Sequence, residues 1–66
     1  MKVISKDPSS VLVRLTKQEL TILANSINEA QEAIEEWELP TRVGSEPAEV
    51  EELRRQLSDL LRADQP

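Results

Sequence analysis

The sequence predicts an α+β fold in which an N-terminal β-hairpin is followed by an antiparallel two-helix hairpin. Three observations predict this fold. A turn containing proline separates two short segments rich in β-branched residues, a capping-box sequence follows the second segment, and two apolar heptad patterns then flank a connector with a proline near each end. With 66 residues, the chain is expected to form a single small domain, residues 1–66.

The first predicted element is a β-hairpin over residues 2–15, with strands at residues 2–6 and 11–15. Three apolar residues of the second strand alternate at period two, which places them on one face: Val11, Val13 and Leu15. The intervening Asp7-Pro8 suits a type I turn, because Asp favours the first position of that turn and Pro the second.

A capping box predicts where the first helix begins. The Thr16 hydroxyl is placed to accept a hydrogen bond from the Glu19 amide, and the Glu19 carboxylate to accept one from the Thr16 amide. Leu15 and Leu20 flank this pair at the spacing of a hydrophobic staple. A long helix is therefore expected to start at Lys17.

This helix is predicted to span residues 17–38. Its apolar residues recur at steps of three and four, as in a heptad seam: Leu20, Leu23, Ile27, Ala30, Ile34 and Trp37. Because Pro40 disfavours helical backbone at Leu39, the helix is expected to end near Glu38. The seam position predicts that Trp37 is chiefly a core residue. The alternative is a half-exposed anchor, since Trp is enriched in interface hot spots.

A second helix is predicted over residues 46–62, after a connector at residues 39–44. Pro47 suits its first turn, where a missing backbone amide costs little. Its apolar residues continue the steps of three and four: Val50, Leu53, Leu57 and Leu60. Because the connector is short, the two helices are expected to be antiparallel neighbours. Residues 63–66 are expected to form a frayed tail.

The missing residue types restrict the chemistry that the chain can perform. The sequence contains no histidine and no cysteine. Nucleophilic catalysis usually relies on a His base, and zinc sites use Cys or His ligands. A calcium loop needs clustered oxygen ligands around a sharp glycine turn, a context that the single Gly44 lacks. We therefore predict that the protein is not an enzyme and that it binds no metal and no cofactor.

Charge is distributed unevenly along the chain. Residues 29–52 contain nine carboxylates and one base, a net charge of −8, whereas residues 1–28 carry +2 and residues 53–66 carry +1. An acidic surface disfavours direct nucleic-acid binding, because phosphate contacts need Lys and Arg. The charge instead favours a basic protein as the partner.

The carboxylates of the first predicted helix lie mostly opposite its apolar seam. They lack interleaved lysines, and they crowd the C-terminal half, where the helix dipole disfavours negative charge. One interpretation is a solvated outer face, and the other is a contact surface. The candidate partner-binding residues are Glu29, Glu32, Glu35, Glu36, Trp37, Glu38 and Arg42. Arg42 is the only base of the acidic stretch, so an intramolecular ion pair is also expected for it.

Self-association is predicted from the small size of the chain. A 66-residue domain buries a small core, and a chain without cysteine has no disulfides to reinforce it. A two-stranded hairpin also leaves both outer edges unpaired, and such edges pair with other chains. We expect a homodimer or a larger even oligomer. The basic residues that could then contact the acidic stretch of a second subunit are Lys2, Lys6, Arg14 and Lys17.

The sequence gives no indication of a membrane protein. Its apolar runs are much shorter than the ~20 residues that a spanning helix needs. The opening Met1-Lys2-Val3-Ile4 is interrupted too early for a signal peptide. The expected location is cytoplasmic.

The segment from Leu15 to Gly44, about half of the chain, carries the pattern L-T-x-x-E-L-x-x-L-x-N-x-I-N-E-A followed by W-E-x-x-T-R-x-G. It resembles a group of small bacterial proteins, some of which are interpreted as immunity-type proteins encoded beside toxins. The resemblance implies an inhibitor whose contacts include Asn28-Glu29 and the segment 37–42. Pro40 and Pro47, which bracket the connector, depart from the simplest helical version of this pattern.

Together these observations favour a non-enzymatic, acidic protein-binding module, with an immunity-like inhibitor of a basic partner as its concrete form. One alternative is a self-associating structural or assembly protein with a solvated acidic face. Another is a nucleic-acid mimic, whose carboxylates would occupy a DNA- or RNA-binding protein. Salt separates the first two, because a complex steered by charge weakens as salt rises, whereas hydrophobic self-assembly does not.

Overall fold

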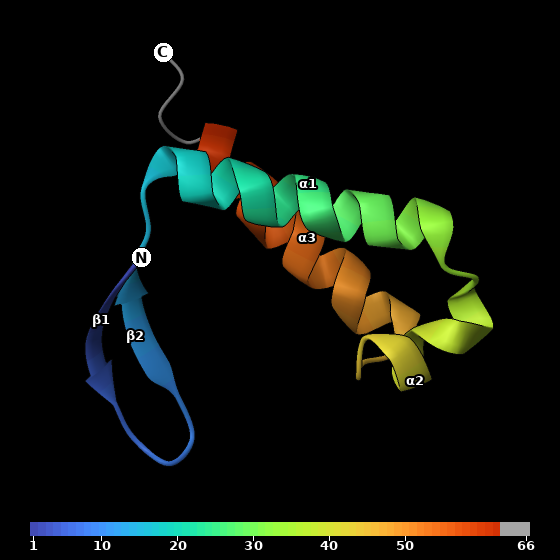
Figure 1. Ribbon diagram of the computed structural model, residues 1–66, viewed down its shortest axis with the longest axis horizontal. Helices are drawn as coiled ribbons and strands as arrows, with labels where there is room; N and C mark the ends of the chain where they lie inside the picture. Colours follow the sequence, from blue (N-terminus) through green and yellow to red (C-terminus); the bar gives the residue numbers. More distant parts are fainter. Residues whose placement is uncertain (63–66) are drawn as a thin grey trace.

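The computed structural model describes residues 1–62. Its elements, in chain order, are β1 (Lys2–Lys6), β2 (Val11–Arg14), α1 (Lys17–Ala33), a 3-10 turn η1 (Glu36–Glu38), α2 (Leu39–Arg42) and α3 (Pro47–Arg62). Figure 1 shows the hairpin projecting from the start of α1, with α1 and α3 antiparallel and α2 at the far end. The predicted α+β class with an N-terminal hairpin is confirmed. The predicted two-helix hairpin is too simple, because a third, short helix lies between the two long ones. The predicted tail, residues 63–66, lies outside the described residues.

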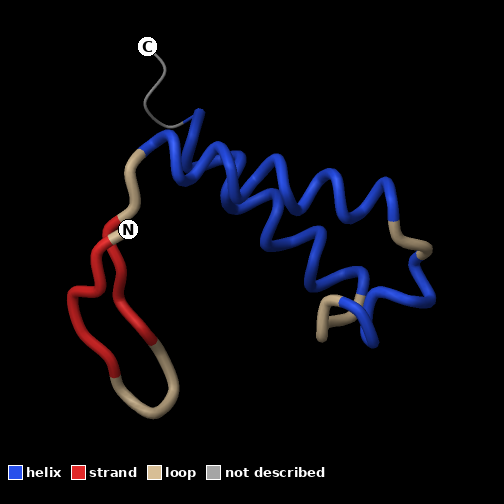
Figure 2. Tube along the Cα trace, in the orientation of Figure 1, coloured by secondary structure: helices blue, strands red, loops and turns tan. Residues whose placement is uncertain are grey.

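The hairpin forms where it was predicted, and β2 ends one residue early, at Arg14. Its two strands run antiparallel (Figure 2). Val3 pairs with Val13 and Lys6 with Val11, and an irregularity between Val3 and Ser5 interrupts the pairing in β1. The turn depends on the Asp7 carboxylate. It accepts hydrogen bonds from the backbone amides of Ser9, at 2.9 Å, and Ser10, at 2.8 Å, and from both serine hydroxyls. These bonds, led by the Ser9 amide, hold the pKa of Asp7 below its usual value.

The capping box is confirmed. The Glu19 amide donates to Thr16 Oγ1 at 3.0 Å, and the Thr16 amide donates to Glu19 Oε1 at 2.9 Å. Thr16 has extended backbone, so the chain changes direction there and α1 begins at Lys17. Glu19 also forms an ion pair with the Met1 amine, which is the main reason that its pKa lies below the usual value.

The first helix ends at Ala33 rather than near Glu38, so the prediction of its end was wrong. Ile34 and Glu35 both have extended backbone, and η1 follows. The helix dipole gives a physical reason. A helix through Glu38 would place three carboxylates in its last turn, where α1 has no base to offset them. With the break, Glu36 and Glu38 fall instead in the first turn of η1.

Leu39 was predicted to lie in a non-helical connector, and this prediction was also wrong. Leu39 has helical backbone and begins α2, and Pro40 occupies the first turn, where a missing amide costs little. α2 ends where the Val43 amide donates to the Leu39 carbonyl at 2.8 Å and Gly44 adopts a φ of 90°. Leu39 is only 2% exposed, which makes it the most buried of the core residues.

The core is small, and α1, α2 and α3 each contribute one buried residue to it. Its buried residues within the described chain are Ala24, Leu39 and Val50. The predicted seam holds in part, since Leu20, Ile27 and Ala30 of α1 are half-buried, as are Ile34 directly after α1 and Leu57 in α3. Leu23, Leu53, Leu60 and Trp37 are exposed instead. Trp37 is 77% exposed, so the prediction that it is a core residue was wrong.

A polar cluster joins α1 to α3. Glu51 accepts a hydrogen bond from Gln31 Nε2 at 3.1 Å, and Arg54 donates to both of its oxygens, from Nε at 2.8 Å and from Nη2 at 2.7 Å. Two-point contact between a guanidinium and a carboxylate is a strong, directional form of hydrogen bonding. The Arg54 bonds, followed by the Gln31 bond, lower the pKa of Glu51 from 4.5 to about 2.

The capping box predicts the effect of Thr16→Ala. The substitution leaves the Glu19 amide without its side-chain acceptor, so the free energy of unfolding should fall by about 1 kcal/mol. Urea denaturation followed by circular dichroism measures this change. Thr41→Ala, in the short α2, is the control for loss of a threonine hydroxyl. A loss at Thr16 of only a few tenths of a kcal/mol would contradict the capping role.

The lowered pKa of Glu51 predicts a pH dependence of stability. Its folded-state pKa of about 2 lies below the usual 4.5, so the carboxylate stabilises the fold above pH 4.5. That contribution is lost as the pH falls from 4.5 towards 2. Glu51→Gln should lower the melting temperature at pH 6, and the difference from the parent protein should close near pH 2. Glu32→Gln removes an equal charge away from the cluster, and a gap of the same size in both variants would contradict the assignment.

Candidate functional site

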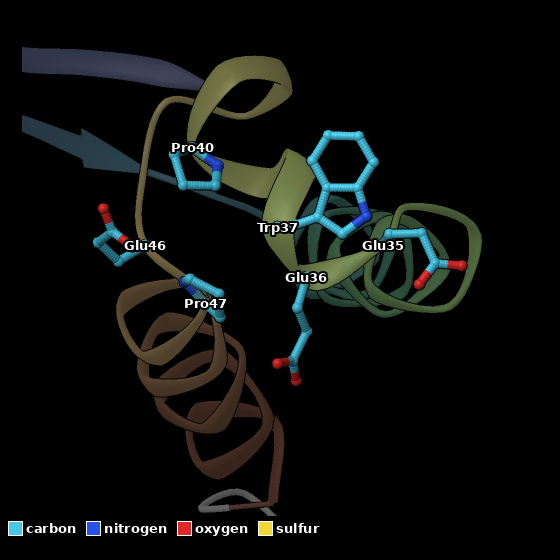
Figure 3. A pocket seen from close by; sticks show the side chains of 6 residues that line it. All are labelled: Glu35, Glu36, Trp37, Pro40, Glu46 and Pro47. Atoms are coloured by element: carbon cyan, nitrogen blue, oxygen red, sulfur yellow. The ribbon is translucent and has the colours of Figure 1, made fainter.

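A wide-open hollow of about 610 Å³ lies at the end of the molecule opposite the hairpin root. We call it the acidic hollow, and it is lined by Glu35, Glu36, Trp37, Pro40, Glu46 and Pro47. Figure 3 shows Glu35, Glu36 and Trp37 on one side of it, with Pro40, Glu46 and Pro47 on the other. The hollow therefore brings together residues from both sides of the connector.

The break in α1 creates this surface. Because α1 stops at Ala33, the chain turns through η1 and α2 before α3 begins at Pro47. Gly44 reverses the chain after α2, and α3 opens with the Glu46 amide donating to the Glu49 carboxylate at 3.2 Å. Two prolines stiffen the far side of the hollow, since each fixes its own φ angle.

Trp37 is the most exposed of the large apolar side chains in the described part of the protein, at 77%. In Figure 3 its indole ring stands clear of the ribbon beside Glu35. The burial of Leu39 explains this exposure. α2 begins with Leu39 in the core, and Trp37, two positions earlier, is then directed into solvent. An exposed Trp presents a large apolar area together with an N–H donor, a combination that is common in interfaces.

The predicted partner-binding residues fall into three places. Glu35, Glu36 and Trp37 line the acidic hollow. Glu38 and Arg42 instead face each other, with Arg42 Nε 3.8 Å from the Glu38 carboxylate, which confirms the ion pair expected for Arg42. Glu29 and Glu32 are exposed on α1 and do not line the hollow.

Two lining residues, Glu46 and Pro47, were not among the contacts expected from the sequence, whereas Pro40 lies within the segment 37–42 that the resemblance implied. From their chain positions, both prolines had been interpreted as residues that end or begin a helix. The signal that was available is their position, since prolines that bound a short connector hold its two ends near each other. Glu46 joins the site because it immediately precedes α3.

The carboxylates of the hollow carry uncompensated charge. Several acids elsewhere in the described residues pair with nearby bases, as Glu51 does with Arg54 at 2.7 Å and Glu52 with Arg55 at 3.3 Å, although Glu29, Glu32 and Glu49 do not. Within residues 1–62, no ion pair involves Glu35, Glu36 or Glu46. Like charges held close together without a cation repel one another, and a cationic ligand would relieve that repulsion.

A second, smaller hollow of about 200 Å³ lies at the root of the hairpin. It is lined by Met1, Leu15, Glu19, Ile22 and Leu23, and its walls are almost entirely apolar. Residues 1–62 contain no group of three or more side chains arranged to hold a metal ion. Among these residues, no helix combines the length and apolar character needed to cross a bilayer.

Comparisons with known proteins add no relatives. No family model, curated protein or solved structure matches this chain.

The exposure of Trp37 predicts that it contributes little to stability. Trp37→Ala should change the free energy of unfolding by no more than about 0.5 kcal/mol, as is usual at exposed positions. Leu39→Ala, two residues away and buried, should cost about 2–5 kcal/mol because it leaves a cavity. Urea denaturation followed by far-ultraviolet circular dichroism compares the two variants. A loss at Trp37 as large as that at Leu39 would mean that the ring is packed in solution.

Proposed function

We propose that the protein is a non-enzymatic protein-binding module whose acidic hollow binds a basic surface of a partner protein. The observation that carries this proposal is an exposed Trp37 beside carboxylates that have no ion pair within residues 1–62. The two features complement each other. The ring supplies apolar contact area, and Glu35, Glu36 and Glu46 supply the charge that selects a cationic partner.

Leaving Trp37 in water costs free energy that burial would have recovered, at about 25 cal/mol for each Å² of apolar surface. Concentrating unpaired carboxylates around it adds repulsion. Both costs are offset if a basic partner covers the ring and pairs with the acids. The partner that fits is a protein surface carrying Lys or Arg beside an apolar patch, because Arg and Lys also stack favourably on an indole face.

An immunity-like inhibitor is the concrete form of this proposal. It follows from the resemblance of Leu15–Gly44 to immunity-type proteins. That segment contains Trp37 and five of the nine carboxylates of the acidic stretch: Glu29, Glu32, Glu35, Glu36 and Glu38. The partner would then be a basic toxin, and the protein would act in the cytoplasm by covering the surface that the toxin uses.

The proposal predicts which residues partner capture depends on. Immobilised protein should retain a basic protein from a lysate of the producing organism at low salt, and less of it at moderate salt. Glu35→Gln/Glu36→Gln/Glu46→Gln should weaken capture at least about tenfold, mainly by slowing association. Trp37→Ala should weaken it further by speeding dissociation. Retention and binding kinetics of the captured protein are the measurements.

A matched variant controls for total charge. Glu29→Gln/Glu32→Gln removes two carboxylates from the exposed α1 surface outside the hollow, and capture should change much less. Trp37 also provides a direct readout, since it is the single Trp of the chain. Its fluorescence should shift to the blue when the captured protein covers it. Equal losses in both Gln variants, or an unchanged emission on binding, would contradict a site at the hollow.

A further inference from the structure

The hairpin is an apolar element that its own chain leaves uncovered. Val3, Ile4, Val11 and Leu12 are each roughly half exposed, and Figure 1 shows the hairpin projecting away from α1 and α3. An isolated two-stranded hairpin is marginal in water unless something packs on it. A covering surface is therefore missing from the single chain.

The chain cannot supply that cover from its own acidic hollow. Only Leu15 and Thr16 separate β2 from α1, and the capping box at Thr16 fixes the path between them. α1 has 17 residues and is about 25 Å long, so it keeps the hairpin root and the hollow at opposite ends. Figure 1 shows this separation, with the hairpin below one end of the helices and α2 at the other.

The two separated surfaces are complementary in charge and in character. The hairpin strands carry Lys2, Lys6 and Arg14 among their apolar residues, and the acid of the hairpin turn, Asp7, is bound within its own turn. The acidic hollow carries Glu35, Glu36 and Glu46 around Trp37 and its two prolines. Each surface therefore offers apolar contact area together with charges of one sign, and the signs are opposite.

Pairing of two hairpins through their edges fits less well. It would bring basic side chains of both copies together, and like charges placed side by side oppose association. β1 also has the features that protect an edge, a lysine near each end and an irregularity between Val3 and Ser5.

We propose that two copies of this chain associate reciprocally, with the basic hairpin of each copy seated in the acidic hollow of the other. The exchange is symmetric, so it closes at two copies and needs no further subunits. The inference rests on the proposed function in one respect, that the acidic hollow is a binding surface. In this arrangement the hairpin of a second copy occupies the hollow, and an external basic partner must displace that hairpin.

A charge-exchange experiment tests this arrangement with purified protein alone. One variant reverses the hairpin, Lys2→Glu/Lys6→Glu, and the other reverses the hollow, Glu35→Lys/Glu36→Lys. The parent protein should approach twice the 7.5 kDa of one chain by light scattering as its concentration is raised, and less so at higher salt. Each variant alone should associate at least about tenfold more weakly, because both contacts become repulsive.

An equimolar mixture of the two variants is the decisive sample. In the mixed pair, the reversed hairpin meets the reversed hollow and the parent hairpin meets the parent hollow, so a dimer should form again. Circular dichroism checks that each variant is folded. Glu29→Lys/Glu32→Lys makes the same change of charge outside the hollow, and it should retain at least part of the parent association and gain nothing from mixing with the reversed hairpin.

Three results would overturn the proposal: a parent protein that stays at 7.5 kDa at millimolar concentration, a mass that keeps rising beyond two chains, or a mixture that associates no better than its components. These results are independent of the proposed function. Capture of an external basic partner is measured on immobilised protein, and it can succeed or fail whatever the mass in solution.

Discussion

Burial of Leu39 is the constraint on which the helical part of the molecule depends. Leu39 is the least exposed residue of the core, and it borders the same space as Gln31 of α1 and Pro47 and Glu51 of α3. To reach that space, the chain must leave the α1 axis after Ala33, turn through η1 and enter α2 with Leu39 as its first residue. This path also determines where Trp37, Pro40 and Glu46 lie. The surface of the acidic hollow is therefore a consequence of the burial of Leu39.

The protein obtains little of its stability from full burial, because Ala24, Leu39 and Val50 are the only buried apolar residues among residues 1–62. Local interactions take a correspondingly larger part. The capping box fixes the start of α1, the Asp7 carboxylate fixes the hairpin turn, and α3 carries ion pairs between residues three apart. Interactions of this kind define the separate elements well, while the small core determines how the helices pack.

This division explains what the sequence could and could not predict. The capping box at Thr16 and the turn at Asp7 involve residues two or three positions apart, so their patterns carry all the necessary information. The end of α1 and the exposure of Trp37 depend on Leu39 reaching a core that α3 completes. No pattern within α1 contains that requirement, and the heptad count continues to Trp37 although the helix does not. The hollow was found only in part for the same reason, since Glu46 and Pro47 join it through the return of the chain.

Gly44 shows a different kind of demand on the sequence. Its φ of 90° lies in the left-handed region, yet no heavy atom beyond its two chain neighbours lies within 4 Å of the position that a Cβ would occupy. The site therefore has room for a side chain, and what it excludes is the L configuration. A D-amino acid would satisfy the same backbone angle while restricting the unfolded chain more than glycine does. At this turn, glycine is required because of the positive φ angle and not because a side chain would lack space.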